Sequence, residues 1–292
     1  MSQNVEMIFY DVQHGNATYI KTPNEKHLMI DLGIGDYSGK NEKFSPLAEL
    51  RNKYKIQQLD HVTITHPHLD HIDDILNFDA FSPQSFLTPK YLTDEEVLKG
   101  TRVGDKPKFD EYLKIRNKYC EPSIGTSHDT SVPDNFGGVL IQRFSTSNLP
   151  HDNFNNHSII TVISYSGIKI VMPGDNEKAS FDELMKSEDF KNAVENANIL
   201  LAPHHGRQSA YHSDFIKLVN PWLTIVSDGS LCDTSANHHY SSNSSGWTVF
   251  KFDGSSEIRK CLTTNSDGEV YVSFGNYLKD GKQTNFLNVK IQ

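Results

Sequence analysis

Short apolar stretches separated by polar and turn residues run along most of the chain, and this pattern predicts many short strands. Near the N-terminus, alternating β-branched and apolar positions predict strands at residues 5–12, 17–22, 27–32 and 59–65. The second half repeats the pattern at residues 139–145, 158–165, 168–172, 198–202 and 222–227. Two stretches on either side of Ser266-Asp267-Gly268, residues 257–262 and 269–274, predict a further β-hairpin.

Helical patterns lie between these strands. We predict helices at residues 45–55, 94–99, 109–119, 180–185, 190–195 and 214–219. Residues 72–135 are the least regular part, and we interpret them as an elaboration that covers a site. Because no internal repeat or low-complexity linker divides the chain, the order of elements favours a layered α/β architecture in one domain over residues 1–292.

Composition excludes several classes of protein. Hydrophobic residues make up 36% of the 292 positions, but 16 Phe, 12 Tyr and 2 Trp are too many aromatic residues for a disordered chain. No apolar run approaches the ~20 residues of a membrane span, and the N-terminus lacks the pattern of a secretion signal, so we expect a cytoplasmic protein. The three cysteines, Cys120, Cys232 and Cys261, form no Cys-x-x-Cys pair and predict neither a disulfide framework nor a cysteine zinc site.

Charge and histidine content narrow the picture further. The 28 basic and 37 acidic residues give a net charge of −9, which disfavours diffuse adhesion to nucleic acid and leaves room for a local basic groove. Residues 99–118 are locally basic and predict either a strip that follows phosphates or an ordinary solvated helix. The 14 histidines cluster, which favours metal chemistry.

The strongest motif is His66-Pro67-His68-Leu69-Asp70-His71, which directly follows a predicted strand. Imidazole and carboxylate groups are ligands suited to zinc, and His66 and His68 alternate so that both rings face one side. The next turn brings Asp70 and His71 to a neighbouring point, so four ligands are available to begin two metal sites. A solvated loop or a single closed structural zinc site remains an alternative, although structural sites favour cysteine-rich sets.

Three further candidate ligands lie where predicted strands begin or end. His157 precedes the strand at 158–165, Asp175 follows the strand at 168–172, and His205 follows the strand at 198–202. Polar side chains at the ends of buried strands are a usual location for functional groups on a layered sheet. Together with the first motif, they complete two coordination spheres.

The sequence resembles the metallo-β-lactamase-fold hydrolases, and among them the soluble domain of the ComEC family of DNA-uptake competence proteins. The motifs that carry the resemblance are Asp11-Val12-Gln13-His14-Gly15-Asn16, Ile30-Asp31-Leu32-Gly33, the run from His66 to His71, Asn156-His157-Ser158, Gly174-Asp175 and Pro203-His204-His205-Gly206. The resemblance extends from about residue 5 to about residue 275 and is interrupted by the elaboration at 72–135. The resemblance implies a metallo-β-lactamase-like αββα sandwich, in which two mixed sheets are flanked by helices.

The resemblance also implies roles for individual residues. His66, His68 and His157 would hold one zinc, Asp70, His71 and His205 the other, and Asp175 would lie between them; manganese could replace zinc. A water between two cations loses its proton near neutral pH and becomes the nucleophile. Asp31 and Asp11 would act as second-shell carboxylates that support the ligands. His14, Asn16 and Arg207 would contact substrate.

Hydrolysis also needs a group that gives a proton to the leaving group. We expect the catalytic residues to include Asp70 and a histidine that donates this proton. His238 and His239, in the segment that resembles a Gly-His-Pro motif of competence proteins, and His212 are candidates for this proton donor because histidine titrates in the required range. His204, next to the ligand His205, would be a further catalytic group that supports the ligands or contacts substrate.

The leading hypothesis is a zinc phosphodiesterase that cleaves nucleic acid, specifically DNA, through a hydroxide held by two metals. The fold alone does not select the substrate, since related sites hydrolyse several kinds of ester. A small-molecule phosphodiesterase or other ester hydrolase, of the cyclic-nucleotide or phosphocholine type, is the first alternative. A catalytically silent metal-binding module is the second.

Overall fold

The computed structural model describes residues 3–36, 43–121, 123–229 and 235–292, and Cys232 lies outside this part. Within it, a nine-stranded sheet has the order β14-β13-β17-β16-β1-β2-β3-β6-β7. Its strands are β1 (Gln3–Phe9), β2 (Thr18–Lys21), β3 (His27–Ile30), β6 (His61–Thr63), β7 (Ser85–Leu87), β13 (Trp247–Lys251), β14 (Ser256–Arg259), β16 (Val270–Lys279) and β17 (Lys282–Ile291). Antiparallel pairs such as Met7 with Val272 join β1 to β16, whereas β3, β6 and β7 run parallel.

A second sheet of six strands, counted over the same residues, has the order β15-β12-β11-β10-β9-β8. Its strands are β8 (Leu140–Phe144), β9 (Ile160–Tyr165), β10 (Ile168–Met172), β11 (Ile199–Leu201), β12 (Leu223–Val226) and β15 (Cys261–Thr263). It is also mixed, since β8 to β10 pair antiparallel and β10, β11, β12 and β15 run parallel. A short pair, β4 (Gly35–Asp36) and β5 (Lys43–Phe44), stands apart.

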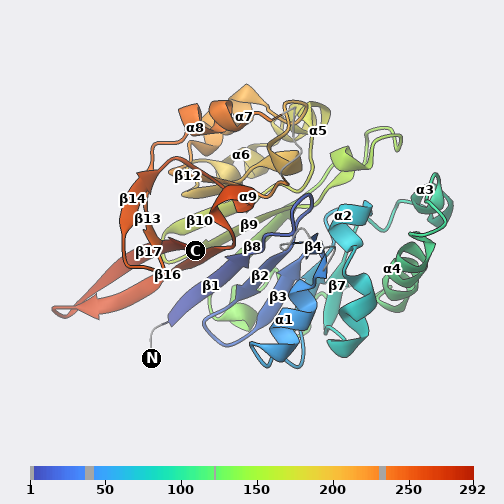
Figure 1. The fold of residues 1–292 in the computed structure, drawn as a ribbon, viewed down its shortest axis with the longest axis horizontal. Coiled ribbons are helices and arrows are strands. Elements are labelled where there is room, and N and C mark those ends of the chain that lie inside the picture. Colours follow the sequence, from blue (N-terminus) through green and yellow to red (C-terminus); the bar gives the residue numbers. More distant parts are fainter. Residues whose placement is uncertain (1–2, 37–42, 122, 230–234) are drawn as a thin grey trace.

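Helices cover the outer face of each sheet (Figure 1). On the nine-stranded sheet these are α1 (Pro46–Asn52), α2 (Leu69–Ile72), α3 (Asp94–Leu98), α4 (Lys106–Lys118) and the 3₁₀ turn η1 (Ile75–Ala80). On the six-stranded sheet they are α5 (Lys178–Leu184), α6 (Glu188–Val194), α7 (Ser213–Val219) and α8 (Asn237–Asn243). Further short turns are α9 (Thr264–Asp267), η2 (Pro133–Phe136), η3 (Phe154–His157) and η4 (Pro203–Gly206). The expected αββα sandwich is therefore confirmed.

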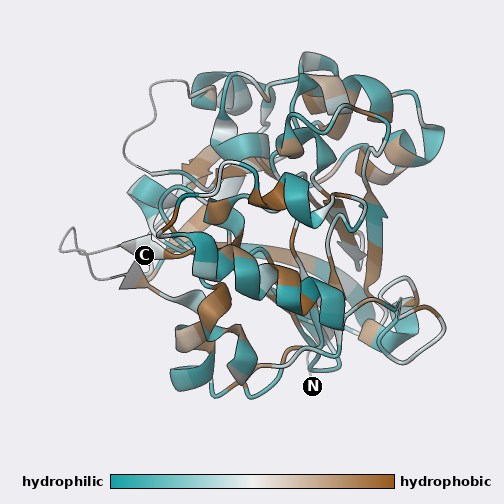
Figure 2. Cartoon of the chain, turned by 90° about the vertical axis from the view of Figure 1, so that its right-hand side faces the viewer, coloured by the Kyte–Doolittle hydropathy of each residue, from teal (hydrophilic) through white to brown (hydrophobic). Residues whose placement is uncertain are grey.

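Strand alternation builds the central core between the two sheets. In β1, Val5, Met7 and Phe9 point inward, while Ile8 packs on the helix side with the residues of α1 and α4. The six-stranded sheet does the same, since Ile170 faces the central core and Val171 packs against α5 to α7. Because both faces of these strands are buried, their sequences are nearly continuous apolar runs. In Figure 2 the apolar colour accordingly gathers on the strands between the helical layers, which are largely hydrophilic.

The C-terminal part differs from its prediction. Residues 266–268 do not form a hairpin turn: they belong to α9 and the residue after it, and the flanking strands β15 and β16 lie in different sheets. The chain changes sheet at Lys260, between β14 and β15, so local turn residues could not reveal the partner strands. The segment from 72 to 135, interpreted as an elaboration, also contributes β7 to the edge of the larger sheet.

Among the described residues, we find no helix that combines the length and the apolar character needed to cross a bilayer.

Candidate metal centre

The predicted ligands come from loops at one end of both sheets. Residues 66–71 follow β6 of the larger sheet, while Asp175 follows β10 and His205 follows β11 of the smaller sheet. Asp70, His71, Asp175 and His205 each place one ligand atom so that all four lie within 4.8 Å of one another. The site therefore joins residues that are more than a hundred positions apart in the sequence.

Distances within this group are short and involve both carboxylates. Nε2 of His205 lies 3.2 Å from Oδ2 of Asp70 and 3.3 Å from Oδ2 of Asp175. Nε2 of His71 lies 3.2 Å from Oδ1 of Asp175. His71, Asp175 and His205 are buried, and Asp70 is partly exposed, so the group is open on the Asp70 side.

The two imidazoles are held by their other ring nitrogens. Nδ1–H of His71 donates to Oδ2 of Asp31 at 2.7 Å, and Nδ1–H of His205 donates to the carbonyl of Ser227 at 2.9 Å. These hydrogen bonds fix the tautomer and the ring orientation. Each Nε2 lone pair is consequently available to a cation when the ring is neutral.

The donor set fits a divalent metal. Nε2 of His66, His71 and His205 are buried and make no well-directed hydrogen bond with any described residue, although carboxylate oxygens lie 3.2 Å from Nε2 of His71 and of His205. Such an arrangement is costly for polar atoms in a folded protein unless another group satisfies them. Imidazole nitrogens and carboxylates are the ligands of catalytic zinc sites, and a metal ion would satisfy these atoms.

His66 and His68 lie beside this group. Nε2 of His66 is 3.9 Å from Oδ2 of Asp175, and the His66 ring lies 4.3 Å from the His71 ring and 4.5 Å from the His68 ring. His68 begins α2 as its N-cap residue. Burial, opposed by the nearby Asp70 and Asp175 carboxylates, lowers the pKa of His68 and keeps it in the neutral form that a metal requires.

The histidines and carboxylates of the metal centre shift one another's pKa values. Burial of His205 opposes its protonation, but the Asp175 and Asp70 carboxylates outweigh this effect and raise its pKa to about 10. Burial likewise opposes charge on Asp175, and His205 and His71 outweigh it, so the pKa of Asp175 falls well below its ordinary value. The carboxylates therefore favour a positive charge at this point, whether from protons or from a metal.

Close backbone approach positions Asp175. Gly174 has φ = +59°, and a Cβ at this position would lie 2.9 Å from Cβ of Ser158 and 3.0 Å from Cβ of Thr65. The adjacent Asp175 N–H donates to Oγ of Ser158 at 3.1 Å. Only glycine allows the loop to come this near without displacing a neighbour.

Backbone strain marks the loop that carries His205. His204 and His205 are consecutive non-glycine residues with φ of 48° and 53°, a conformation that costs of order 1–3 kcal/mol per residue. Hydrogen bonds hold it in place: His204 N–H donates to the Gly174 carbonyl at 3.1 Å, and Ala236 N–H donates to the Gly206 carbonyl at 2.7 Å.

The structure does not bring His157 into the group. Its Nδ1 lies 3.0 Å from the Thr146 carbonyl and 3.0 Å from the hydroxyl of Tyr91, and its Nε2 lies 3.1 Å from the Pro150 carbonyl. Contacts on both ring nitrogens direct the ring onto the loop before η3. In this arrangement the next residue, Ser158, faces the site instead, through its bond with Asp175.

Asn16 and Asp11 also have other surroundings than we predicted. Asn16 is buried, and its amide donates to Oδ2 of Asp31 at 3.0 Å, so it supports the carboxylate that holds His71 and does not take the predicted place at the open side of the group. Asp11 accepts from the backbone and side chain of Gln13, each at 3.1 Å, and within the described part of the chain it forms no hydrogen bond or ion pair with a ligand histidine. Asp31 has the expected place, since it binds His71 and also accepts from the Thr65 N–H at 2.7 Å.

His14 and Arg207 lie together at the open side of the group. The His14 ring lies 4.5 Å from the His205 ring, and its Nε2 is 3.4 Å from Oδ2 of Asp70. Arg207 Nη2–H donates to Nδ1 of His14 at 3.3 Å. Both side chains can therefore meet a molecule bound at the group.

The two candidate catalytic histidines are placed differently. His204 is partly exposed, with Nδ1 3.0 Å from Oε1 of Glu177 and Nε2 3.8 Å from Oδ2 of Asp175. The hydrogen bond from His204 lowers the pKa of Glu177 to about 2. His238 is exposed on α8, its ring is tilted against that of His239 at 3.8 Å between centroids, and among the described residues it makes no hydrogen bond or ion pair with the group.

Two acids next to the site were not predicted. Glu177 holds His204, and Oδ1 of Asp228 lies 3.6 Å from Nδ1 of His14. The sequence carried a signal for each: Glu177 stands two residues after Asp175, and Asp228 directly follows a predicted strand.

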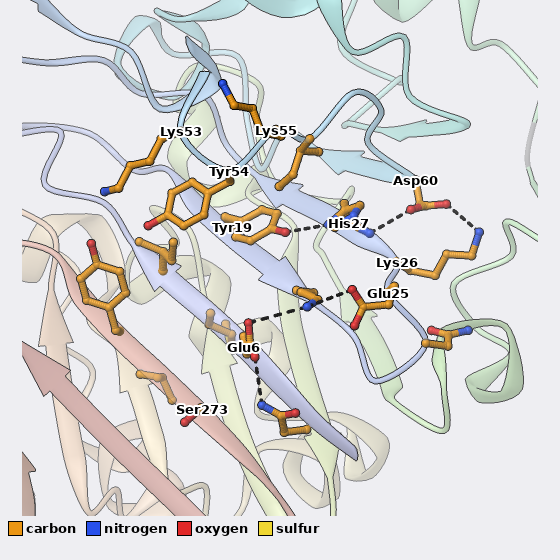
Figure 3. A pocket seen from close by; sticks show the side chains of 18 of the residues that line it. Glu6, Tyr19, Glu25, Lys26, His27, Lys53, Tyr54, Lys55, Asp60 and Ser273 are labelled. Atoms are coloured by element: carbon orange, nitrogen blue, oxygen red, sulfur yellow. Dashed lines mark hydrogen bonds and ion pairs between the residues drawn. The ribbon is translucent and has the colours of Figure 1, made fainter. Parts of the chain in front are cut away.

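A separate cavity of about 1130 Å³ lies on the outer face of the nine-stranded sheet (Figure 3). Its polar groups bind one another: Lys26 pairs with Asp60 at 2.7 Å, and the Tyr19 hydroxyl lies 2.6 Å from Nδ1 of His27. None of the predicted site residues lines it. The candidate site therefore remains at the histidine and aspartate group.

Comparison with known proteins finds several that are similar to this chain. ComE operon protein 3 of Bacillus subtilis (strain 168) is 24% identical over 252 residues, which cover 78% of this chain but only 29% of that protein. A metallo-beta-lactamase superfamily protein of Thermotoga maritima is 13% identical, with 88% of this chain and 97% of that chain covered and a TM-score of 0.41. CmlA, a diiron β-hydroxylase of Streptomyces venezuelae, is 11% identical, with 78% and 45% covered and a TM-score of 0.46.

The family model described as the metallo-beta-lactamase superfamily matches residues 10–222, which contain every member of the histidine and aspartate group. The chain belongs to the metallo-beta-lactamase superfamily, whose members are generally dinuclear metal hydrolases.

Proposed function

We propose that this protein is a zinc-dependent phosphodiesterase that hydrolyses DNA. The observation that carries the proposal is the convergence of Asp70, His71, Asp175 and His205, whose buried Nε2 atoms face carboxylate oxygens but make no well-directed hydrogen bond among the described residues. Two zinc ions, or manganese in their place, would supply a nucleophile from water and neutralise developing charge on phosphate oxygens.

Side chains on both sheets would hold the metals. Asp70, His71 and His205 would bind one, and His66 and His68 the other, with Asp175 shared. His157 is not available in the present arrangement, so the second set has fewer protein ligands than the first. Asp31 and the Ser227 carbonyl keep the Nε2 atoms of His71 and His205 directed at the metals.

Residues around the group would position and protonate the substrate. Arg207 and His14 supply N–H donors beside Asp70, which suits a phosphate because guanidinium matches two of its oxygens. His204, oriented by Glu177 at Nδ1, presents Nε2 toward Asp175 and is placed to hand a proton to the leaving oxygen. The exposed His238 is a weaker candidate for this role.

Similarity to ComE operon protein 3, and the competence-type motifs, favour DNA as the substrate. A small phosphodiester is a second candidate, because the groove that contains Asp70 and His14 has a volume of about 400 Å³, which suits a small ligand.

Incubation of zinc-loaded protein with linear DNA and with bis-p-nitrophenyl phosphate tests the proposal. We expect both to be hydrolysed, and we expect Asp70→Asn to abolish both reactions. Asp110→Asn, which removes an exposed carboxylate from α4, is the matched control and should retain them. Hydrolysis of bis-p-nitrophenyl phosphate alone would favour a small phosphodiester as the substrate. Hydrolysis of neither compound would contradict the proposal that the protein is a phosphodiesterase.

A further inference from the structure

A groove of about 400 Å³ connects the metal centre with the segment between α3 and α4. Its lining combines His14, Leu69 and Asp70 with residues from the 99–109 segment, namely Gly100, Thr101, Arg102, Asp105 and Phe109; Asp73 completes it. The part of the chain interpreted as a covering elaboration thus forms one wall of a groove that contains a candidate metal ligand.

This wall is fixed to α2, the helix that carries the candidate ligands Asp70 and His71. Lys108 of α4 forms an ion pair with Asp73, the residue that follows α2, and Phe109 is buried in the same core as Ile72. Leu69 of α2 packs on that core as well. Because α2 carries Asp70 and His71, the position of the 99–109 segment relative to the metal centre is set by packing.

Most of the basic residues in this region are already neutralised. Four of them pair with acids: Lys106 with Asp110, Lys108 with Asp73, Lys114 with Glu111 and Arg116 with Asp94. Lys118 lies over the ring of Tyr119. The basic stretch at 99–118 is therefore not a continuous strip of free positive charges that could follow the phosphates of a nucleic acid.

Arg102 differs from these residues in two respects. It is exposed and lines the groove, and no carboxylate in the described part of the chain pairs with it. Asp105 and the paired Asp73 are the other charged groups that the 73–109 region contributes to the lining. Arg102 offsets the charge of Asp105, so without Arg102 this wall would carry a net negative charge that disfavours an anionic substrate along the groove.

We propose that Arg102 binds a backbone phosphate of the substrate other than the one that is cleaved. Arginine suits this role because its planar guanidinium can donate two parallel hydrogen bonds to a phosphate. The inference rests on the proposed phosphodiesterase function and specifies its substrate: a polymer with several phosphates gains a contact that an isolated phosphodiester lacks.

Binding of a short fluorescein-labelled phosphorothioate oligothymidylate, followed by fluorescence anisotropy, tests this role without turnover. For Arg102→Ala in the zinc-loaded protein we expect about tenfold weaker binding, the loss typical of one hydrogen-bonded charged contact. Lys106→Ala removes the same charge from the same segment but does not line the groove, and should bind like the wild type. Asp105→Asn should bind more tightly, because it removes the opposing charge.

Activity gives an independent measurement. In Arg102→Ala, the ratio of kcat/KM for linear DNA to kcat/KM for bis-p-nitrophenyl phosphate should fall about tenfold, since only DNA offers a second phosphate. Equal oligonucleotide affinity of Arg102→Ala and Lys106→Ala, or no binding by the wild type, would overturn the role of Arg102. Wild-type binding that depends on Arg102 without hydrolysis of either ester would instead overturn the phosphodiesterase.

Discussion

Among single residues, the clearest contrast is between two predicted ligands, His157 and His205. Both are fully buried histidines, but His205 directs Nε2 at two carboxylates, whereas His157 has a carbonyl oxygen near each ring nitrogen. We expect His205→Ala to lower the zinc content of the purified protein and His157→Ala to leave it unchanged. Elemental analysis of both variants measures this, with thermal unfolding as a check that each is folded.

Loss of zinc from His157→Ala with retention of its fold would show that the loop before η3 rearranges to deliver this ring to the metal. Such a result would return His157 to the ligand set that the histidine motifs predicted.

Asp31 orients the candidate ligand His71 but is not itself a predicted metal ligand. Its carboxylate accepts from Nδ1–H of His71 at 2.7 Å and also from Thr65 and Asn16. In Asp31→Asn an amide N–H can face His71 and favour the wrong tautomer, so we expect zinc affinity to fall about 10- to 100-fold. Competition with a chromogenic chelator measures the change.

Asp11→Asn is the control for this experiment. Asp11 is also a buried acid on a nearby loop, but it binds Gln13 and no ligand histidine. Its substitution should leave zinc affinity within twofold of the wild type. Equal losses in the two variants would mean that general charge, and not orientation of His71, underlies the effect of Asp31.

At the scale of elements, the turn after β10 depends on Gly174. In Gly174→Ala the positive φ costs about 1–2 kcal/mol, and contacts with Ser158 and Thr65 add about 1–3 kcal/mol. We expect a total loss of roughly 2–5 kcal/mol in the free energy of unfolding, measured by urea denaturation. Gly125→Ala, at φ = +75° with open space around its Cβ, should lose only the backbone cost.

Elements whose pattern reflects burial could be predicted from sequence. The strands β1, β2, β3, β10 and β11 follow apolar positions that both layers of the sandwich require, and the His66 to His71 motif follows β6 as expected. Ser45 caps α1 through the backbone N–H of Ala48, which agrees with the predicted helix start. The sequence pattern was sufficient to predict a helix or strand wherever the residue types of that element reflect its own burial or capping.

Elements whose identity depends on distant partners were missed. β17 (Lys282–Ile291) is half polar because much of one face is exposed, and it was not predicted, although it joins β13 to β16. Dependence on distant residues also explains the one ligand that was placed differently. The motifs bring most candidate ligands to the predicted loops. The direction of the His157 ring, however, is set by Thr146, Pro150 and Tyr91, which the spacing of residues along the chain does not reveal.

For the whole molecule, the metal centre is a junction between the two sheets. Asp70 and His71 follow a strand of the nine-stranded sheet, whereas Asp175 and His205 follow strands of the six-stranded sheet. A metal bound to all four would cross-link the layers that the central core already packs together. Its binding energy should therefore stabilise the global fold and not only the loops.

We expect zinc to raise the unfolding temperature and a chelator to lower it. A ligand that binds only the folded state adds about 2.7 kcal/mol at a concentration of about 100 times its Kd, which corresponds to several degrees for a chain of this size. Scanning calorimetry of the zinc-loaded and chelator-treated protein measures the shift. His205→Ala should reduce it, because the smaller sheet then loses its imidazole ligand, whereas His128→Ala, outside the group, should retain it. An unfolding temperature that responds to neither zinc nor chelator would mean that the four side chains converge without binding a metal.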